Sequence, residues 1–214
     1  MKSTIRNAIN YIERFYQNEF SGHDFYHSMR VYKLAKIIAE KENADVEIVS
    51  LAALLHDVDD RKLSPDTYDG KENAVAFLKR EYVLDFIITR ICNIIDEVSF
   101  QGADSVIPKT IEGKCVQDAD RLDALGAIGI ARTFTYGGSH NRDIYNPQIP
   151  PKLEMTKDEY IEHVSTSINH FYEKLFLLKG LMNTQYAKKI AEKREKYMKA
   201  YIEEFMMEWD GRDN

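Results

Sequence analysis

Apolar residues recur at helical spacing along almost the whole chain. Between residues 4 and 18, one apolar stripe follows the i, i+3, i+4, i+7 pattern and is formed by Ile5, Ala8, Ile9, Ile12 and Tyr16. The same periodicity predicts further helices at residues 25–41, 45–55, 71–80 and 83–98, then from about Thr110, Lys157 and Thr184. No alternating strand pattern, internal repeat or linker interrupts the series. The sequence therefore predicts one all-α domain over residues 1–214, a bundle of about seven helices.

Two stretches depart from this simple periodicity. Gly126 and Gly129 continue the helix that begins near Thr110. Because glycine weakens an isolated helix, their spacing predicts the close approach of another helix. Residues 136–155 contain Gly137, Gly138 and three prolines, which predict a long loop. Long loops in compact domains are often lids or binding segments, so we expect this one to shape substrate choice.

Four polar residues fall on faces that should be buried. His27 continues the inward stripe of the helix at 25–41, and His56 and Asp57 follow the apolar run at 50–55. Asp120 lies at the border of a buried stripe, whereas Asp118 is expected to point roughly the other way. Burial of an imidazole beside a carboxylate costs several kcal/mol unless the two form a hydrogen-bonded pair or ligate a metal.

The chemistry of these residues favours the metal. Two imidazoles and two carboxylates suit Mn²⁺, Fe²⁺, Co²⁺ or Ni²⁺ in octahedral geometry, with two positions left for water or substrate. Asp59 and Asp60 follow Asp57 closely, and three carboxylates in four positions would repel one another without a cation. No thiolate contributes, so a closed structural zinc site is not expected. Cys92 and Cys115 lie in helical patterns and are interpreted as small buried residues without a disulfide.

Composition narrows the set of partners. The formal net charge of −6 argues against a nucleic-acid-binding surface, which is normally basic. No apolar run approaches the roughly 18 residues needed to span a membrane. The N-terminal residues 1–6 lack the apolar core of a signal peptide. We therefore expect a cytoplasmic protein that acts on a small molecule, without a nucleic acid polymer or a membrane as partner, and leave a homodimer open.

The pattern His … His-Asp … Asp resembles that of the HD superfamily of metal-dependent phosphohydrolases. Five stretches resemble its small bacterial single-domain members, and together they cover nearly the whole chain: His23–Val31, Ala52–Asp57, Asp118–Ala124, Ile128–Phe134 and Asn169–Leu175. The resemblance implies an HD-type helical bundle whose metal ligands are His27, His56, Asp57 and Asp120. No histidine lies between Asp57 and Asp120, which favours a single metal over the two-metal branches of the superfamily. Mn²⁺ is the expected ion, with Fe²⁺, Co²⁺, Ni²⁺ or Mg²⁺ as alternatives.

The same resemblance points to Asp60, three residues after Asp57, as an acidic catalytic group. The expected mechanism is attack by a metal-activated water. Asp60 is expected either to orient or deprotonate this water, or to protonate the leaving group. His23, at the entrance of its helix, is expected to support the ligands or face the phosphates. Residues that could neutralise phosphate charge or line the pocket are Arg61, Lys62, Lys114, Arg121, Tyr136, His170 and Lys174.

Three functions remain open at this stage. The first, favoured by the resemblance, is the splitting of a (deoxy)nucleoside triphosphate into the monophosphate and pyrophosphate. The second is a 5′-nucleotidase or small phosphodiesterase at the same metal, since both reactions need the same ligands. The third is a non-catalytic nucleotide sensor. A helical scaffold with two buried ion pairs is the least favoured interpretation, because four such residues would have to face inward by chance.

Overall fold

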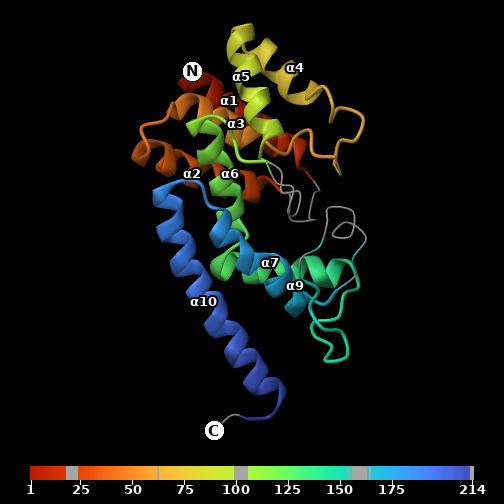
Figure 1. Ribbon diagram of the computed structural model, residues 1–214. Helices are drawn as coiled ribbons and strands as arrows, with labels where there is room; N and C mark the ends of the chain where they lie inside the picture. The colour runs from red at the N-terminus through yellow and green to blue at the C-terminus, as the bar shows by residue number, and fades with distance from the viewer. Residues whose placement is uncertain are drawn as a thin grey trace. The chain divides into compact units, whose positions relative to one another are not determined.

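The computed structural model describes residues 1–17, 24–61, 63–98, 106–153, 155, 163 and 165–212. Every regular element in this part of the chain is a helix, which confirms the all-α prediction (Figure 1). The elements are α1 Lys2–Phe15, α2 Phe25–Lys41, α3 Val46–Leu55, α4 Glu72–Arg80, α5 Asp85–Asp96, α6 Ile111–Asp123, α7 Gly126–Ser139, α9 Ser167–Glu173, the 3₁₀-helix η2 Leu175–Leu181 and α10 Gln185–Trp209. The described chain thus holds more helices than the seven or so predicted.

The described residues form two compact units, one up to residue 120 and the other from residue 121 onward. In the first unit α3 is central, because it packs against α1, α2 and α5 (Figure 1). All eight residues from Ile48 to Leu55 are buried. In the second unit α7 packs against α9 and α10, and η2 packs against the same two helices. The single domain over residues 1–214 stays a prediction.

Side-chain caps mark the starts of three helices. Asp24 accepts a hydrogen bond from His27 N, Asp45 from Glu47 N and Ile48 N, and Thr184 from Ala187 N. These side chains satisfy backbone N–H groups that have no partner inside the helix. The caps therefore fix where α2, α3 and α10 begin.

The helix predicted from Thr110 is two helices. Leu125 is extended and Gly126 has φ +75°, so the chain turns between α6 and α7. A side chain at Gly126 would meet Arg194 of α10, which confirms the predicted close approach of another helix there. At Gly129 the prediction was wrong, because a Cβ there would lie 2.1 Å from the carbonyl oxygen of Ala124. The crowding at Gly129 comes from the preceding turn of the same chain segment.

Two other boundaries differ from the sequence prediction. Helix α7 continues through Gly137 and Gly138 to Ser139, so the loop begins later than Tyr136. Gly137 does not end the helix. Its lack of a side chain allows Ser167 to pack against it, because a Cβ there would lie 2.2 Å from Ser167 Oγ.

The helix predicted from Lys157 falls partly outside the described residues, and the helix that the structure describes there begins at Ser167. Thr166 is extended and accepts a hydrogen bond from Asn169 N, which starts α9 at that point. After Glu173 the chain tightens into η2 instead of continuing as an α-helix.

Both cysteines are free, as predicted, with Cys115 buried and Cys92 half-buried. Among the described residues no helix combines the length and the apolar character that crossing a membrane requires. The cytoplasmic location stays a prediction.

Candidate metal centre

His27 lies in the first turn of α2, where the cap of the helix holds it. Asp24 Oδ1 accepts a hydrogen bond from His27 N at 2.6 Å. The side chain is buried, with 1% of its surface exposed. Its Nε2 atom lies 3.3 Å from Asp57 Oδ2 and 3.4 Å from Asp120 Oδ1. One imidazole from α2 therefore faces two carboxylates from other parts of the first unit.

His56 and Asp57 follow the buried end of α3 and share this cluster. His56 Nδ1 lies 2.9 Å from the Ala53 carbonyl, so Nδ1 carries the proton that this bond requires. The other ring nitrogen, Nε2, lies 3.2 Å from Asp57 Oδ2 and 3.8 Å from Asp120 Oδ1. The backbone carbonyl thus orients the ring so that Nε2 faces the carboxylates.

Asp120 reaches the cluster from α6, and its side chain is 26% exposed. The neighbouring Asp118, expected to point roughly the other way, is completely buried. Helix α6 is buried on more faces than its sequence pattern indicated, because every residue from Cys115 to Ala119 is buried. The structure nevertheless brings Asp120, and not Asp118, within 4 Å of both imidazoles.

This arrangement fits a divalent metal ion. His27, His56 and Asp57 each offer a ligand atom, and the three atoms lie within 4.8 Å of one another. An octahedral ion with bonds of about 2.1 Å places neighbouring ligand atoms about 3 Å apart. The four separations between the imidazole Nε2 atoms and the carboxylate oxygens run from 3.2 to 3.8 Å, and three of them are within 3.4 Å.

One buried atom supports the same conclusion. His56 Nε2 makes no hydrogen bond of acceptable geometry within the described chain, although it is buried against two carboxylates. A buried nitrogen without a hydrogen bond is costly, and a cation shared with the carboxylates would remove that cost. The cluster could therefore hold a metal; its donors do not identify which ion.

The charges in the cluster shift its ionisation. Burial lowers the pKa of His56, but the close Asp57 carboxylate, followed by the charge of Asp120, outweighs burial and raises that pKa. Burial raises the pKa of Asp120, but the hydrogen bond of His27 and the positive charges of His56 and His27 lower it overall. The lowered pKa of Asp120 shows that its carboxylate favours a positive charge beside it, which a divalent cation would supply.

The turn after Asp57 carries two further carboxylates. Asp60 N donates to the Asp57 carbonyl at 3.1 Å, and the Asp60 side chain is half-buried. Asp59 is buried and bonds to the start of α4. Burial, followed by the charge of Asp57 and then that of Asp60, raises the pKa of Tyr16 well above its ordinary value. Sequence reasoning placed Tyr16 only in an apolar stripe and missed the influence of these charges.

The other predicted residues are distributed over both units. His23 and Lys62 lie outside the described residues. Arg61 is exposed in the turn after Asp60, and Lys114 is half-buried on α6. Arg121 is buried, and its guanidinium donates to the carbonyl oxygen of Leu181, so part of its capacity to bind a phosphate is engaged.

Tyr136, His170 and Lys174 belong to one region of the second unit. The Tyr136 ring stacks on His140 at 3.9 Å, and the Arg142 guanidinium lies 5.2 Å from the Tyr136 ring centre. Burial, followed by the charges of Lys174 and Arg142, lowers the pKa of His170 to about 3. His170 is therefore neutral near pH 7 beside two cations. Sequence reasoning missed Arg142, which comes from a loop without a motif.

His163 lies partly buried beside Glu173. Its side chain is 21% exposed, and its Nε2 lies 3.0 Å from Glu173 Oε1. The same oxygen accepts hydrogen bonds from Ser165 Oγ and Lys152 N. Glu173 thus joins the chain before α9 to the helix, a role that periodicity could not reveal.

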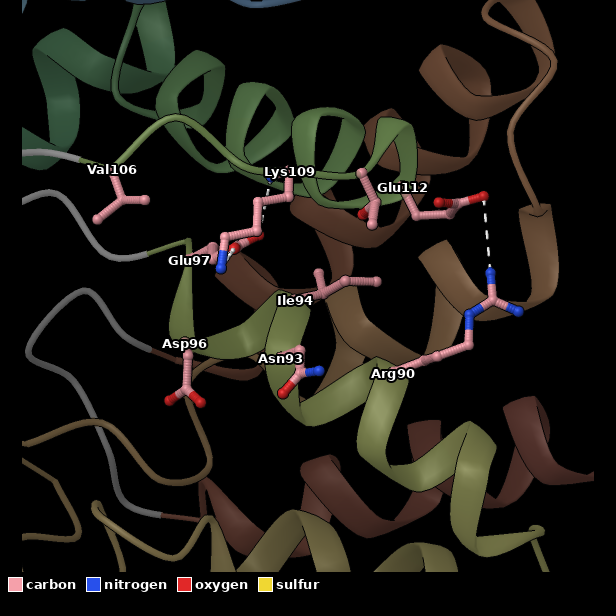
Figure 2. Close-up of a pocket in the computed structure, with 9 residues that line it drawn as sticks. Arg90, Asn93, Ile94, Asp96, Glu97, Val106, Lys109 and Glu112 are labelled. Atoms are coloured by element: carbon pink, nitrogen blue, oxygen red, sulfur yellow. Dashed lines mark hydrogen bonds and ion pairs between the residues drawn. The ribbon is translucent and has the colours of Figure 1, made fainter.

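A cavity of about 480 Å³ in the first unit lies between α5 and the segment that leads into α6 (Figure 2). None of the four clustered residues lines it. Figure 2 shows two pairs of its charged groups directed at one another, with Arg90 3.9 Å from Glu112 and Lys109 4.0 Å from Glu97. The charges of this cavity are therefore largely compensated within it.

Comparison with known proteins agrees with this geometry. Residues 24–125 match the model of the HD domain family. The uncharacterized protein YpgQ of Bacillus subtilis is 36% identical over 220 residues, which cover 95% of this chain and 92% of YpgQ. The crystal structure of YpgQ in complex with ADP has a TM-score of 0.75 and 34% identity, and the match covers 98% of this chain and 100% of that one.

Two further crystal structures cover nearly all of the chain. A Lactobacillus plantarum protein has a TM-score of 0.87 and 37% identity, with 99% of both chains covered. An HD-superfamily hydrolase from Bacillus thuringiensis has a TM-score of 0.78 and 42% identity, with 98% of both covered. The chain belongs to the HD family and is a metal-dependent phosphohydrolase.

Proposed function

We propose that the chain hydrolyses nucleotides, splitting a (deoxy)nucleoside triphosphate into the monophosphate and pyrophosphate. The observation that carries this proposal is the cluster of two imidazoles and two carboxylates around His27 Nε2. In this proposal Asp120 is the fourth ligand beside His27, His56 and Asp57. The ADP complex of YpgQ, a relative along nearly its whole length, supports a nucleotide as the ligand.

The residues of the chain have separate roles in this reaction. A divalent ion, with Mn²⁺ as the proposed one, supplies Lewis acidity toward a phosphate oxygen and makes water a nucleophile near neutral pH. His27, His56, Asp57 and Asp120 hold it. Asp60, carried on the same turn as Asp57, orients the attacking water and accepts its proton, or returns a proton to the leaving group.

Phosphate charge needs donors beyond the metal ligands. Arg142 and Lys174 place two positive charges around neutral His170, which can donate or accept a hydrogen bond without adding charge. We propose that these residues and Tyr136 contact the substrate, with His23, Arg61, Lys62, Lys114 and Arg121 as further candidates. The predicted loop, which begins after Ser139, contributes Arg142 and is proposed to influence which nucleotide binds.

The test is a panel of nucleotides assayed with Mn²⁺, Mg²⁺, Co²⁺ and Ni²⁺, with pyrophosphate and phosphate measured separately. Metal-dependent release of pyrophosphate from triphosphates, lost in Asp57→Ala, is the expected result. Phosphate released from monophosphates would instead establish the nucleotidase. Tight nucleotide binding without turnover under any metal would establish the sensor. The two latter outcomes would each overturn the triphosphate reaction.

A further inference from the structure

The turn that follows His56 and Asp57 is fastened to the beginning of α4. Asp59 Oδ1 accepts a hydrogen bond from Asn73 N, and Asp59 Oδ2 accepts one from Ala74 N, both at 3.0 Å. These N–H groups lie in the first turn of α4 and have no acceptor within the helix. The carboxylate is buried, with 2% of Asp59 exposed, and lies at the positive end of the helix dipole.

Asp59 caps α4 in place of Lys71, the residue that directly precedes the helix. Lys71 occupies the N-cap position with φ +50°, and its side chain makes no capping hydrogen bond. Its ammonium instead lies 2.8 Å from Asp96 Oδ1 of α5. The start of α4 is therefore capped by a residue twelve or more positions earlier in the chain, at the end of the turn that carries Asp57.

A second set of contacts fastens the same turn. Asn73 Nδ2 donates to the Val58 carbonyl and to Thr67 Oγ1, each at 3.0 Å. The Val58 side chain is completely buried. Asn73 therefore binds the turn through its side chain while its backbone N–H binds Asp59.

The turn is too short for its residues to move independently. Val58 N donates to the Leu55 carbonyl at 3.3 Å, and Asp60 N donates to the Asp57 carbonyl at 3.1 Å. We propose that Asp59 is a positioning residue: by capping α4, it holds the turn that presents Asp57 to His27 and His56, and so sets the affinity of the cluster for a divalent ion. This rests on the proposed ligation by Asp57 and adds a residue that does not itself touch the ion.

The experiment measures Mn²⁺ binding to metal-free protein by electron paramagnetic resonance, together with thermal unfolding without metal. We expect Asp59→Ala to bind Mn²⁺ roughly 10-fold or more weakly than wild type, as for residues that orient metal ligands in other proteins. Asp59→Asn keeps one acceptor oxygen and should lose less affinity. The matched control is Thr184→Ala, which removes the cap of α10 in the second unit and should leave the Mn²⁺ affinity unchanged.

A folded Asp59→Ala protein with the Mn²⁺ affinity of wild type would overturn the proposal. If Asp59→Ala does not fold, Asp59→Asn decides, because it keeps the size of the side chain while one of the two oxygens that accept from Asn73 N and Ala74 N is lost. Weaker Mn²⁺ binding by that variant supports the proposal, and unchanged binding overturns it. Wild-type protein that binds no Mn²⁺, or Asp57→Ala that binds it as wild type does, would overturn the metal centre itself and this inference with it.

Discussion

His27 Nε2 lies 3.4 Å from Asp120 Oδ1, although one residue is in the first turn of α2 and the other near the end of α6. His56 and Asp57 come to the same point from the end of α3. A site built from separate helices exists only while those helices are packed together. Metal binding and folding should therefore be coupled.

Removal and return of the metal should change the melting temperature. Protein treated with a chelator and then given Mn²⁺ at about 100 times its Kd should gain about 2.7 kcal/mol of folding free energy. For a chain of this length that corresponds to a rise of roughly 5–10 °C in melting temperature. Differential scanning calorimetry measures it. An equal rise in Asp57→Ala would show that the ion binds elsewhere.

Gly129 should not tolerate a side chain. A Cβ at this position would lie 2.1 Å from the Ala124 carbonyl oxygen, so Gly129→Ala must displace backbone and should lose roughly 1–3 kcal/mol of unfolding free energy. Gly138, in the same helix, has nothing within 4 Å of its Cβ position. Gly138→Ala should therefore be neutral or stabilise by up to about 1 kcal/mol. Urea unfolding compares the two, and equal effects would contradict the packing at Gly129.

Glu195 should make stability depend on pH. Burial alone would raise its pKa, but hydrogen bonds from Lys179 at 2.6 Å and Lys199 at 3.3 Å lower it overall. The ionised form therefore stabilises the fold above the pKa of the unfolded chain, and this contribution is lost as pH falls through the lowered pKa. Glu195→Gln should melt roughly 2 °C below wild type at pH 7. The difference should shrink in acid; a gap that stays constant would argue against the ion pairs.

The Tyr16 hydroxyl should matter for activity more than for stability. It is buried and makes no hydrogen bond of ordinary geometry within the described chain, so Tyr16→Phe should change the unfolding free energy by less than about 1 kcal/mol. Its raised pKa keeps it protonated near Asp57 and Asp60, where it can donate to a carboxylate or to water. We expect turnover to fall roughly 10-fold. Unchanged turnover would show that the hydroxyl has no part in the reaction.

The sequence predicted the features that depend on periodicity and local caps. His27 belongs to the inward stripe of α2, and His56 and Asp57 follow the apolar run of α3. Because both helices bury these faces, the sequence predicted that the three side chains lie close together. The helix starts predicted at residues 25, 45 and 184 lie within one residue of the capped starts of α2, α3 and α10.

The features that sequence reasoning missed depend on contacts between distant segments. The sequence predicts a loop at Gly137, whereas in the structure this glycine lies within α7 and its lack of a side chain makes room for Ser167. In the sequence Asp59 is one of three neighbouring carboxylates. Only the structure shows that it binds the N–H groups at the start of α4. The burial of Asp118 could not be predicted either, because it depends on the segments that pack around α6. The helical period alone places Asp118 on a different face from Asp120.

The most direct measurement of the central claim compares Asp120→Asn with Asp118→Asn. Both substitutions keep the size of the side chain on the same helix, and only Asp120 lies within 4 Å of the two imidazoles. Isothermal titration with Mn²⁺ should show one site in wild type, retained in Asp118→Asn and weakened more than roughly 10-fold in Asp120→Asn. Wild-type affinity in Asp120→Asn, or equal losses in both variants, would contradict a metal centre formed by His27, His56, Asp57 and Asp120.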